Sequence, residues 1–273
     1  MSALLSRLLL VTIIFWLSIV RASETAPRKK KNEKFFPSWE RLKQSSEISL
    51  ASPLTYFPLI GAAIIGIGKW DQKISDWAIE KSPVFGSHMT ASRFSDHFKN
   101  ALMAEALTTT ILVSLYGKRF RKTTMKSSSL PGAVISSSMA LPAMLSNGMG
   151  ILSTASVVGS LKLETGRTRP NEHNDNSFPS MHTALSFGFA TVAAKNLESL
   201  SMNSNLRSGL TLTSYFLAAA VGWGRIEGRR HYPTDVLVGA ALGHFVSGFV
   251  YDAFLRPHIP KDEEFSLDIS PSR

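Results

Sequence analysis

The most informative stretch of the sequence is RIEGRRHYPTD, residues 225–235, which ends at the start of an apolar run. Within it, Arg225, His231 and Asp235 bring together a cation, an imidazole and a carboxylate. The histidine and the aspartate lie four residues apart, so they can meet if the Pro-Thr pair between them begins a helix. A carboxylate that accepts one ring N–H orients the imidazole and leaves the other nitrogen free to attack an electrophile.

Two earlier segments carry groups that complement this stretch. The first holds Lys162 and Arg169, and the second is FPSMHT at residues 178–183. Ser180 precedes an apolar helical run, which predicts that it caps that helix, and the free N–H groups of a helix N-terminus suit an anion. Arginine forks match phosphate oxygens, and His182 can donate a proton to a leaving oxygen. Together the three segments predict a site that holds a phosphoryl group and attacks its phosphorus.

Each segment also has an ordinary explanation when it is taken alone. The Lys162, Arg167 and Arg169 cluster fits a solvated basic helix end, which is favourable to the helix dipole. A Pro-Ser pair caps many helices, and a His-x-x-x-Asp spacing is common in surface ion pairs. Arg167, Arg229 and Arg230 are explained as well by solvated loop charge as by a role at the mouth of the site. The order and spacing of all three segments favour the site.

In this order the segments resemble the motifs of the type 2 phosphatidic acid phosphatase (PAP2) superfamily, which also contains bacterial acid phosphatases and vanadium haloperoxidases. Those motifs are Lys-x6-Arg-Pro, Pro-Ser-Gly-His and Ser-Arg-x5-His-x3-Asp. Lys162 with Arg169 and its following proline matches the first in full. Two positions depart from the pattern, because Met181 stands where the family has glycine and Gly224 where it has serine.

The resemblance implies a role for each matched residue. His231 would be the nucleophile that forms a phosphohistidine, Asp235 its orienting partner, and His182 the proton donor to the leaving group. The phosphate oxygens would be held by Lys162, Arg169, Ser180, Met181 (through its backbone N–H) and Arg225. No metal and no other cofactor is implied, because the cations stabilise the transferring phosphoryl group. We expect the Met181 side chain to alter the substrate fit rather than to abolish activity.

The activity that the resemblance implies is that of a metal-independent phosphatase, acting on a phosphomonoester or on a lipid phosphate or diphosphate. Two alternatives stay open. One is a vanadate-dependent haloperoxidase, which uses the same cage, although such enzymes tend to be much larger. The other is a non-catalytic exported protein that binds anionic components of the cell envelope.

The composition of the chain restricts the classes of molecule that the protein is expected to bind. The 273-residue chain carries a net charge of +10 and contains no cysteine, so no disulfide supports its fold. The basic balance suits a phosphorylated small molecule, a lipid substrate or an acidic membrane surface. No nucleic acid is expected, because the basic residues do not interleave with an aromatic stacking platform.

The N-terminus resembles a secretory signal peptide, with Arg7 ahead of the apolar run 8–20 and a cleavage site after Ala22. An uncleaved anchor is the alternative, although this run is short for a membrane span. The expected organisation is a signal peptide at 1–22, a basic linker at 23–50, a PAP2-like phosphatase domain at 51–257 and a C-terminal tail at 258–273. We expect an exported protein, in the periplasm or at the membrane, with its active site facing outward.

Beyond residue 50, apolar stretches alternate with polar ones and strand alternation is absent. This pattern predicts an all-α fold, a single bundle of about six long helices, with the site at the ends of the C-terminal helices. The charge-free stretch 127–161 contains Pro142 and Asn147-Gly148, which predict a break into two helices. Most apolar runs are shorter than the roughly 20 residues of a membrane span, so we expect a lipid-associated bundle rather than one fully buried in lipid.

Overall fold

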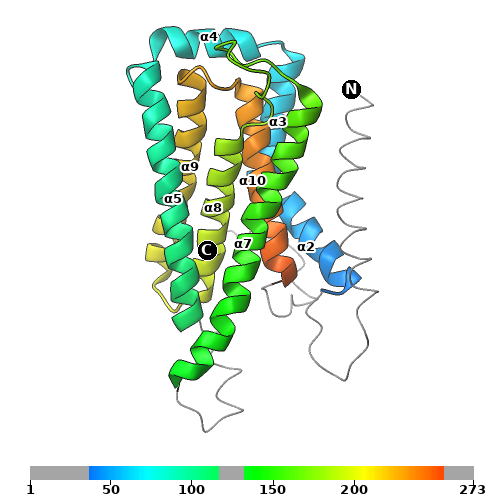
Figure 1. The fold of residues 1–273 in the computed structure, drawn as a ribbon, viewed down its shortest axis with the longest axis vertical. Helices are drawn as coiled ribbons and strands as arrows, with labels where there is room; N and C mark the ends of the chain where they lie inside the picture. The colour runs from blue at the N-terminus through cyan, green and yellow to red at the C-terminus, as the bar shows by residue number, and fades with distance from the viewer. Residues whose placement is uncertain (1–36, 117–131, 255–273) are drawn as a thin grey trace, which may run out of the picture.

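The computed structural model describes residues 37–116 and 132–254, and these residues are all-α, with eight helices. The helices are α2 (Trp39–Ala51), α3 (Pro53–Ile67), α4 (Asp71–Lys81), α5 (His88–Tyr116), α7 (Gly132–Thr165), α8 (Met181–Ser199), α9 (Ser204–Glu227) and α10 (Pro233–Phe254). The longer helices run lengthwise in one bundle, and α4 lies across one end of it (Figure 1). The all-α single bundle predicted from the sequence is therefore confirmed.

Local sequence signals set where several helices begin. Ser180 is the N-cap of α8, and its hydroxyl accepts a hydrogen bond from the Thr183 N–H, as the sequence predicted. Asn203 caps α9 by accepting from two backbone N–H groups. Pro53 and Pro233 are the first residues of α3 and α10, where the missing N–H of proline costs no helical hydrogen bond.

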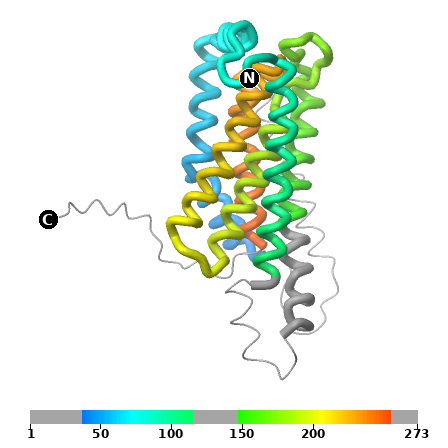
Figure 2. The backbone as a smooth tube through the Cα atoms, turned by 90° about the vertical axis from the view of Figure 1, so that its left-hand side faces the viewer, coloured from blue at the N-terminus to red at the C-terminus, as the bar shows by residue number. Residues whose placement is uncertain are grey.

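Helices α8 and α10 form the centre of the bundle, and most of their residues are buried. They approach closely because glycine lines the crossing. A β-carbon at Gly243 would lie 2.0 Å from the carbonyl oxygen of Ala184, and one at Gly239 would lie 2.6 Å from that of Ser180. Figure 2, turned by 90° from Figure 1, also shows the long helices side by side. The contact fixes the start of α8 against the start of α10.

Helix α7 differs from the sequence prediction. It runs from Gly132 to Thr165 as one helix, so the predicted break at Pro142 and Asn147-Gly148 is wrong. The side-chain amide of Asn147 donates to Thr110 Oγ1 of α5, at 2.8 Å, instead of ending the helix. Tertiary contacts of this kind override local turn propensity.

The N-terminal segments fall partly outside the described residues. The expected signal peptide, the first part of the expected linker and the C-terminal tail at 258–273 lie there. The end of the 23–50 segment, expected to be linker, forms most of α2. Arg41 ties this helix to the bundle, because its guanidinium donates to the backbone oxygen of Asp252 at 3.0 Å, and Leu42 is buried against α10.

Within the described residues, α10 is the single helix that is by itself long and apolar enough to cross a membrane. Its most apolar 18-residue stretch is 78% buried inside the bundle. The bent pair α2 and α3 passes the same test when the two helices are taken together.

The glycine crossing generates a stability prediction. Gly243→Ala should destabilise the fold by about 1–3 kcal/mol, because the added methyl group must push α8 away from α10. Gly159→Ala on α7 is the matched control, since no atom lies within 4 Å of a β-carbon there. Thermal unfolding of the two variants checks this. Equal unfolding temperatures would contradict the close approach.

Candidate active site

The residues singled out in the sequence meet at the end of the bundle that α4 crosses (Figure 1). Lys162 lies in the last turn of α7, Arg225 in the last turn of α9, and Asp235 in the first turn of α10. The Ser180 N–H donates to the backbone oxygen of Asp235 at 2.9 Å, which joins the second motif to the third. Each motif thus sits at a helix end. A loop joins the first motif to the second, and α8 and α9 run along the bundle and back between the second and the third.

Three cations line the site with few anions to balance them. Arg225 is 5% exposed, and the Nε donors of Arg169 and Arg225 are both buried without a hydrogen-bond partner. Burial, together with the charge of Arg169, lowers the pKa of Lys162 to about 8. Burial likewise lowers the pKa of Arg225 to about 10. Buried donors that lack acceptors, on side chains that repel one another, are suited to a multiply charged oxyanion.

His231 and Asp235 are both buried and face each other. Nδ1 of His231 lies 3.6 Å from Oδ2 of Asp235, an ion-pair separation longer than a hydrogen bond, and this nitrogen has no hydrogen-bond partner. Burial lowers the pKa of His231 to about 4, although the carboxylate opposes the shift. The imidazole is therefore neutral at pH 7. Its Nδ1 is the ring nitrogen that faces Asp235, so Nε2 lies on the other side of the ring.

Arg167, which the sequence left between solvated loop charge and a role at the mouth, has a defined structural place. Its guanidinium donates to Asp235 Oδ1 at 2.7 Å and to Thr234 Oγ1 at 2.8 Å. It also pairs with Asp71 at 2.7 Å and lies over the Tyr232 ring, 4.1 Å from the ring centre. The arginine is paired with two carboxylates, although its side chain is 32% exposed. It links α4 to the start of α10.

The pKa of Asp235 is held below its ordinary value. Burial by itself would raise this pKa, but His231, Arg167 and the Ser177 hydroxyl together outweigh burial. Ser177 Oγ donates to Asp235 Oδ2 at 2.5 Å, and the Tyr232 N–H donates to the same oxygen at 2.9 Å. A carboxylate with this many donors stays ionised and cannot rotate freely.

His182 lies in the first turn of α8, and its Nε2 is 2.9 Å from Oδ1 of Asp96. The same oxygen lies 3.7 Å from Nη1 of Arg225. Asp96 comes from α5, in a polar stretch that gave no motif signal. His182 and Arg225 therefore share one carboxylate oxygen, which places the predicted proton donor next to the cations of the site.

The two departures from the family pattern have structural settings. Met181 is the first residue of α8, so its backbone is helical and needs no left-handed conformation. Gly224 packs against α5, where an added β-carbon would lie 2.9 Å from the Ala91 carbonyl oxygen and 3.1 Å from the Ser95 β-carbon. The family serine would not fit there without moving α5.

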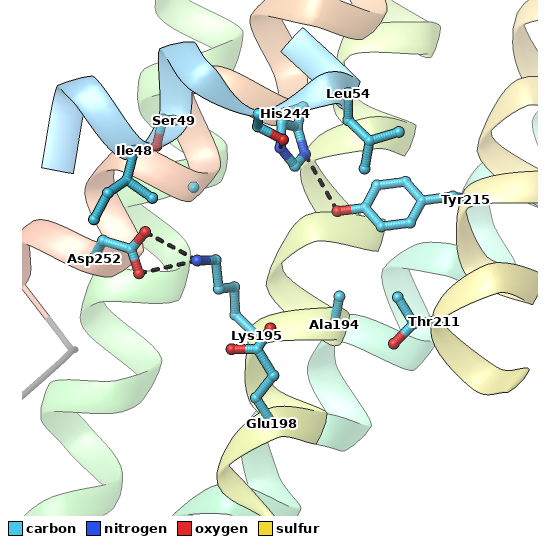
Figure 3. Close-up of a pocket in the computed structure, with 12 residues that line it drawn as sticks. Ile48, Ser49, Leu54, Ala194, Lys195, Glu198, Thr211, Tyr215, His244 and Asp252 are labelled. Atoms are coloured by element: carbon cyan, nitrogen blue, oxygen red, sulfur yellow. Dashed lines mark hydrogen bonds and ion pairs between the residues drawn. The ribbon is translucent and has the colours of Figure 1, made fainter. Parts of the chain in front are cut away.

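A second polar cluster lies toward the far ends of α8 and α10, away from the motifs (Figure 3). It lines a cavity of about 270 Å³ and contains the Lys195–Asp252 ion pair and His244. His244 Nε2 is 2.8 Å from Ser52 Oγ, and its Nδ1 lies 3.2 Å from Tyr215 OH. These groups bind one another, so the cluster is a satisfied polar core. Across the described ranges, 37–116 and 132–254, no group of three His, Cys, Asp or Glu residues could hold a metal ion.

Comparison with known proteins shows the family of the chain. The family model of the PAP2 superfamily matches residues 102–258, more than half of the chain, and this range contains all three motifs. The chain belongs to the PAP2 superfamily. A lipid A 1-phosphatase from Porphyromonas gingivalis is 33% identical over 108 residues, which make up 40% of this chain. The chain spans only about a quarter of that relative, 23% of its length, and no solved structure matches significantly.

The Arg167 contacts generate a prediction about activity. Arg167→Ala should lower kcat/KM for phosphate release from a phosphate ester by about 10- to 100-fold, because a hydrogen bond to a charged group contributes about 1.5–3 kcal/mol. Arg167→Lys should recover only part of this loss, since an ammonium cannot bridge two carboxylates as a fork does.

Arg207→Ala, at the opposite end of α9 from Arg225, is the matched control and should leave kcat/KM unchanged. Steady-state kinetics of the three variants check the prediction. If Arg167→Ala behaved like Arg207→Ala, Arg167 would have no part in holding Asp235.

Proposed function

We propose that this protein is a phosphatase that removes a terminal phosphate from a lipid phosphate through a phosphohistidine intermediate on His231. One observation carries the proposal: the Nε donors of Arg169 and Arg225 are buried without a hydrogen-bond partner, and these two cations interact electrostatically with the facing pair of His231 and Asp235. Such a cluster is costly in an empty site, and a phosphoryl group would satisfy it. Membership in the PAP2 superfamily supports the same reaction.

The first step transfers the phosphoryl group to the protein. Nε2 of His231 attacks the phosphorus, and an N–P bond forms while the bond from phosphorus to the leaving oxygen breaks. Lys162, Arg169 and Arg225 hold the oxygens of the phosphoryl group, whose charge is spread over them in the transition state. His182 gives a proton to the leaving oxygen, so the alcohol departs neutral.

The second step returns the protein to its starting state. A water molecule attacks the phosphorus and gives a proton to His182, while the N–P bond breaks and His231 becomes free. Asp235 balances the positive charge on the His231 ring while that ring carries phosphate. The cations supply the electrostatic stabilisation that a metal supplies in other phosphatases, so we propose that the reaction needs none.

Exposed apolar side chains support a lipid substrate and a membrane location. Helix α3 has no charged residue, and the residues that it buries are the small Thr55 and Ala62. Its large side chains face outward instead, with Phe57 62% and Ile67 83% exposed. Phe216 of α9 is 71% exposed as well. Large apolar surface outside and small residues inside is the arrangement of helices that contact lipid. We propose an exported, membrane-associated protein with its site facing outward.

Purified protein tests the function and the substrate class together. Phosphatidic acid and a prenyl diphosphate, presented in vesicles, should release inorganic phosphate faster than para-nitrophenyl phosphate in solution, and the protein should sediment with the vesicles. His231→Ala should abolish release from all three, because no other group attacks phosphorus. His97→Ala is the control, since His97 is exposed.

No phosphate release by the parent, with tight phosphate binding retained, would select the non-catalytic alternative. Halide oxidation on addition of vanadate and peroxide would select the haloperoxidase. Turnover of the soluble ester alone, by a protein that stays in the supernatant of the vesicles, would leave a phosphatase but overturn the lipid and membrane parts of the proposal.

A further inference from the structure

Asp96 stands between two groups of the site without belonging to any of the three motifs. One oxygen of its carboxylate lies 2.9 Å from Nε2 of His182 and 3.7 Å from Nη1 of Arg225. A leaving oxygen must also lie within reach of both groups, because it takes a proton from the histidine while the arginine holds the phosphoryl group. Asp96 precedes the residues that the family model matches, which begin at 102.

The packing of α5 against α9 positions this carboxylate. Ser95, the neighbour of Asp96 on α5, is fully buried, and its hydroxyl accepts a hydrogen bond from Nη1 of Arg225 at 3.2 Å. Gly224 allows the approach, since a side chain at this position would meet the backbone and Ser95 of α5. The Asp96 side chain is 52% exposed, so it has room to swing away from the site.

The charges around His182 explain why a carboxylate is needed there. Burial lowers the pKa of His182 to about 4, with smaller contributions in the same direction from Arg225 of α9, Lys99 of α5 and His231 of the α9–α10 loop. Asp96 opposes them, and raises the pKa of His182. A histidine that must donate a proton is held among positive groups, and the carboxylate is the neighbour that favours its protonated form.

We propose that Asp96 is a displaceable positioning residue that favours the protonated form of His182 and occupies, in the free protein, the place of the leaving oxygen. This inference rests on the proposed phosphatase function. When substrate binds, its oxygens take over the contacts with Arg225 and His182, and the Asp96 carboxylate moves aside.

The atoms balance in the first step, the transfer of the phosphoryl group to His231. The N–P bond to His231 forms, the bond from phosphorus to the leaving oxygen breaks, and the proton on Nε2 of His182 moves to that oxygen. Asp96 neither gives nor takes a proton in this step. Its effect is exerted through His182 before substrate arrives, and through competition with phosphate for Arg225.

Two effects of opposite direction follow for Asp96→Asn. Catalysis should weaken for leaving groups that need a proton. Turnover of an alkyl phosphate, such as phosphatidic acid, should fall at least about tenfold, within the range that general acid catalysis contributes. Turnover of para-nitrophenyl phosphate should change little, because its leaving group is stable as an anion. Inorganic phosphate should bind about three- to tenfold more tightly, since a negative charge beside Arg225 is lost.

The pH profile gives a further readout with a defined sign. Because Asp96 raises the pKa of His182, its replacement lowers that pKa, and His182 loses its proton at a lower pH. The alkaline limb of kcat/KM for the alkyl phosphate, which reports the free protein, should therefore move to lower pH in Asp96→Asn, and Asp96→Glu should restore much of the parent profile. Glu80→Gln, an exposed charge removal on α4, is the matched control and should change neither property.

The experiment measures the kinetics of the parent, Asp96→Asn, Asp96→Glu and Glu80→Gln on both substrates across pH, together with the affinity of each for inorganic phosphate by calorimetry. Equal losses on the two substrates with unchanged phosphate affinity would overturn the role of Asp96, because damage to the fold does not distinguish leaving groups. A parent that releases no phosphate would instead overturn the proposed function, whereas the calorimetric comparison would still test the competition for Arg225.

Discussion

The close crossing of α8 and α10 is the constraint on which the rest of the site depends. Gly239 and Gly243 let the backbone of α8 come against α10, and the Ser180 N–H is hydrogen-bonded to the Asp235 carbonyl oxygen at that point. The second and third motifs are therefore held in one register by backbone contacts rather than by flexible side chains. A shift of α8 would move His182 relative to His231, and the proposed mechanism requires these two histidines to act on opposite sides of one phosphorus.

The site contains two kinds of arginine, which differ in how fully their charge is paired. Arg167 is paired with Asp71 and Asp235, and holds the carboxylate that faces His231. Arg225 keeps a buried donor free, beside a carboxylate that is half exposed and can leave. Fixed pairs give orientation, and an incompletely paired cation gives affinity for an arriving anion. Under the proposed function, such a site would bind phosphate without a large rearrangement.

The sequence predicted the all-α bundle and the residues that converge in it, because motif spacing and apolar periodicity are local signals. It could not place Arg167, whose partner Asp71 lies 96 residues away and belongs to no motif. Asp96 gave no motif signal for the same reason, since only the packing of α5 on α8 and α9 brings it to His182 and Arg225. The continuity of α7 was also missed, because Asn147 is held by a contact with α5 that no local pattern records.

Phosphorylation of His231 during turnover is the central claim, and rapid quenching tests it most directly. Protein mixed with radiolabelled phosphatidic acid is quenched in alkali, digested, and searched by mass spectrometry for the peptide that contains residue 231. One acid-labile phosphoryl group on His231, formed and discharged at rates consistent with turnover, is the expected result. Steady phosphate release with no label on the protein at any time, or with label on a different residue, would contradict the mechanism.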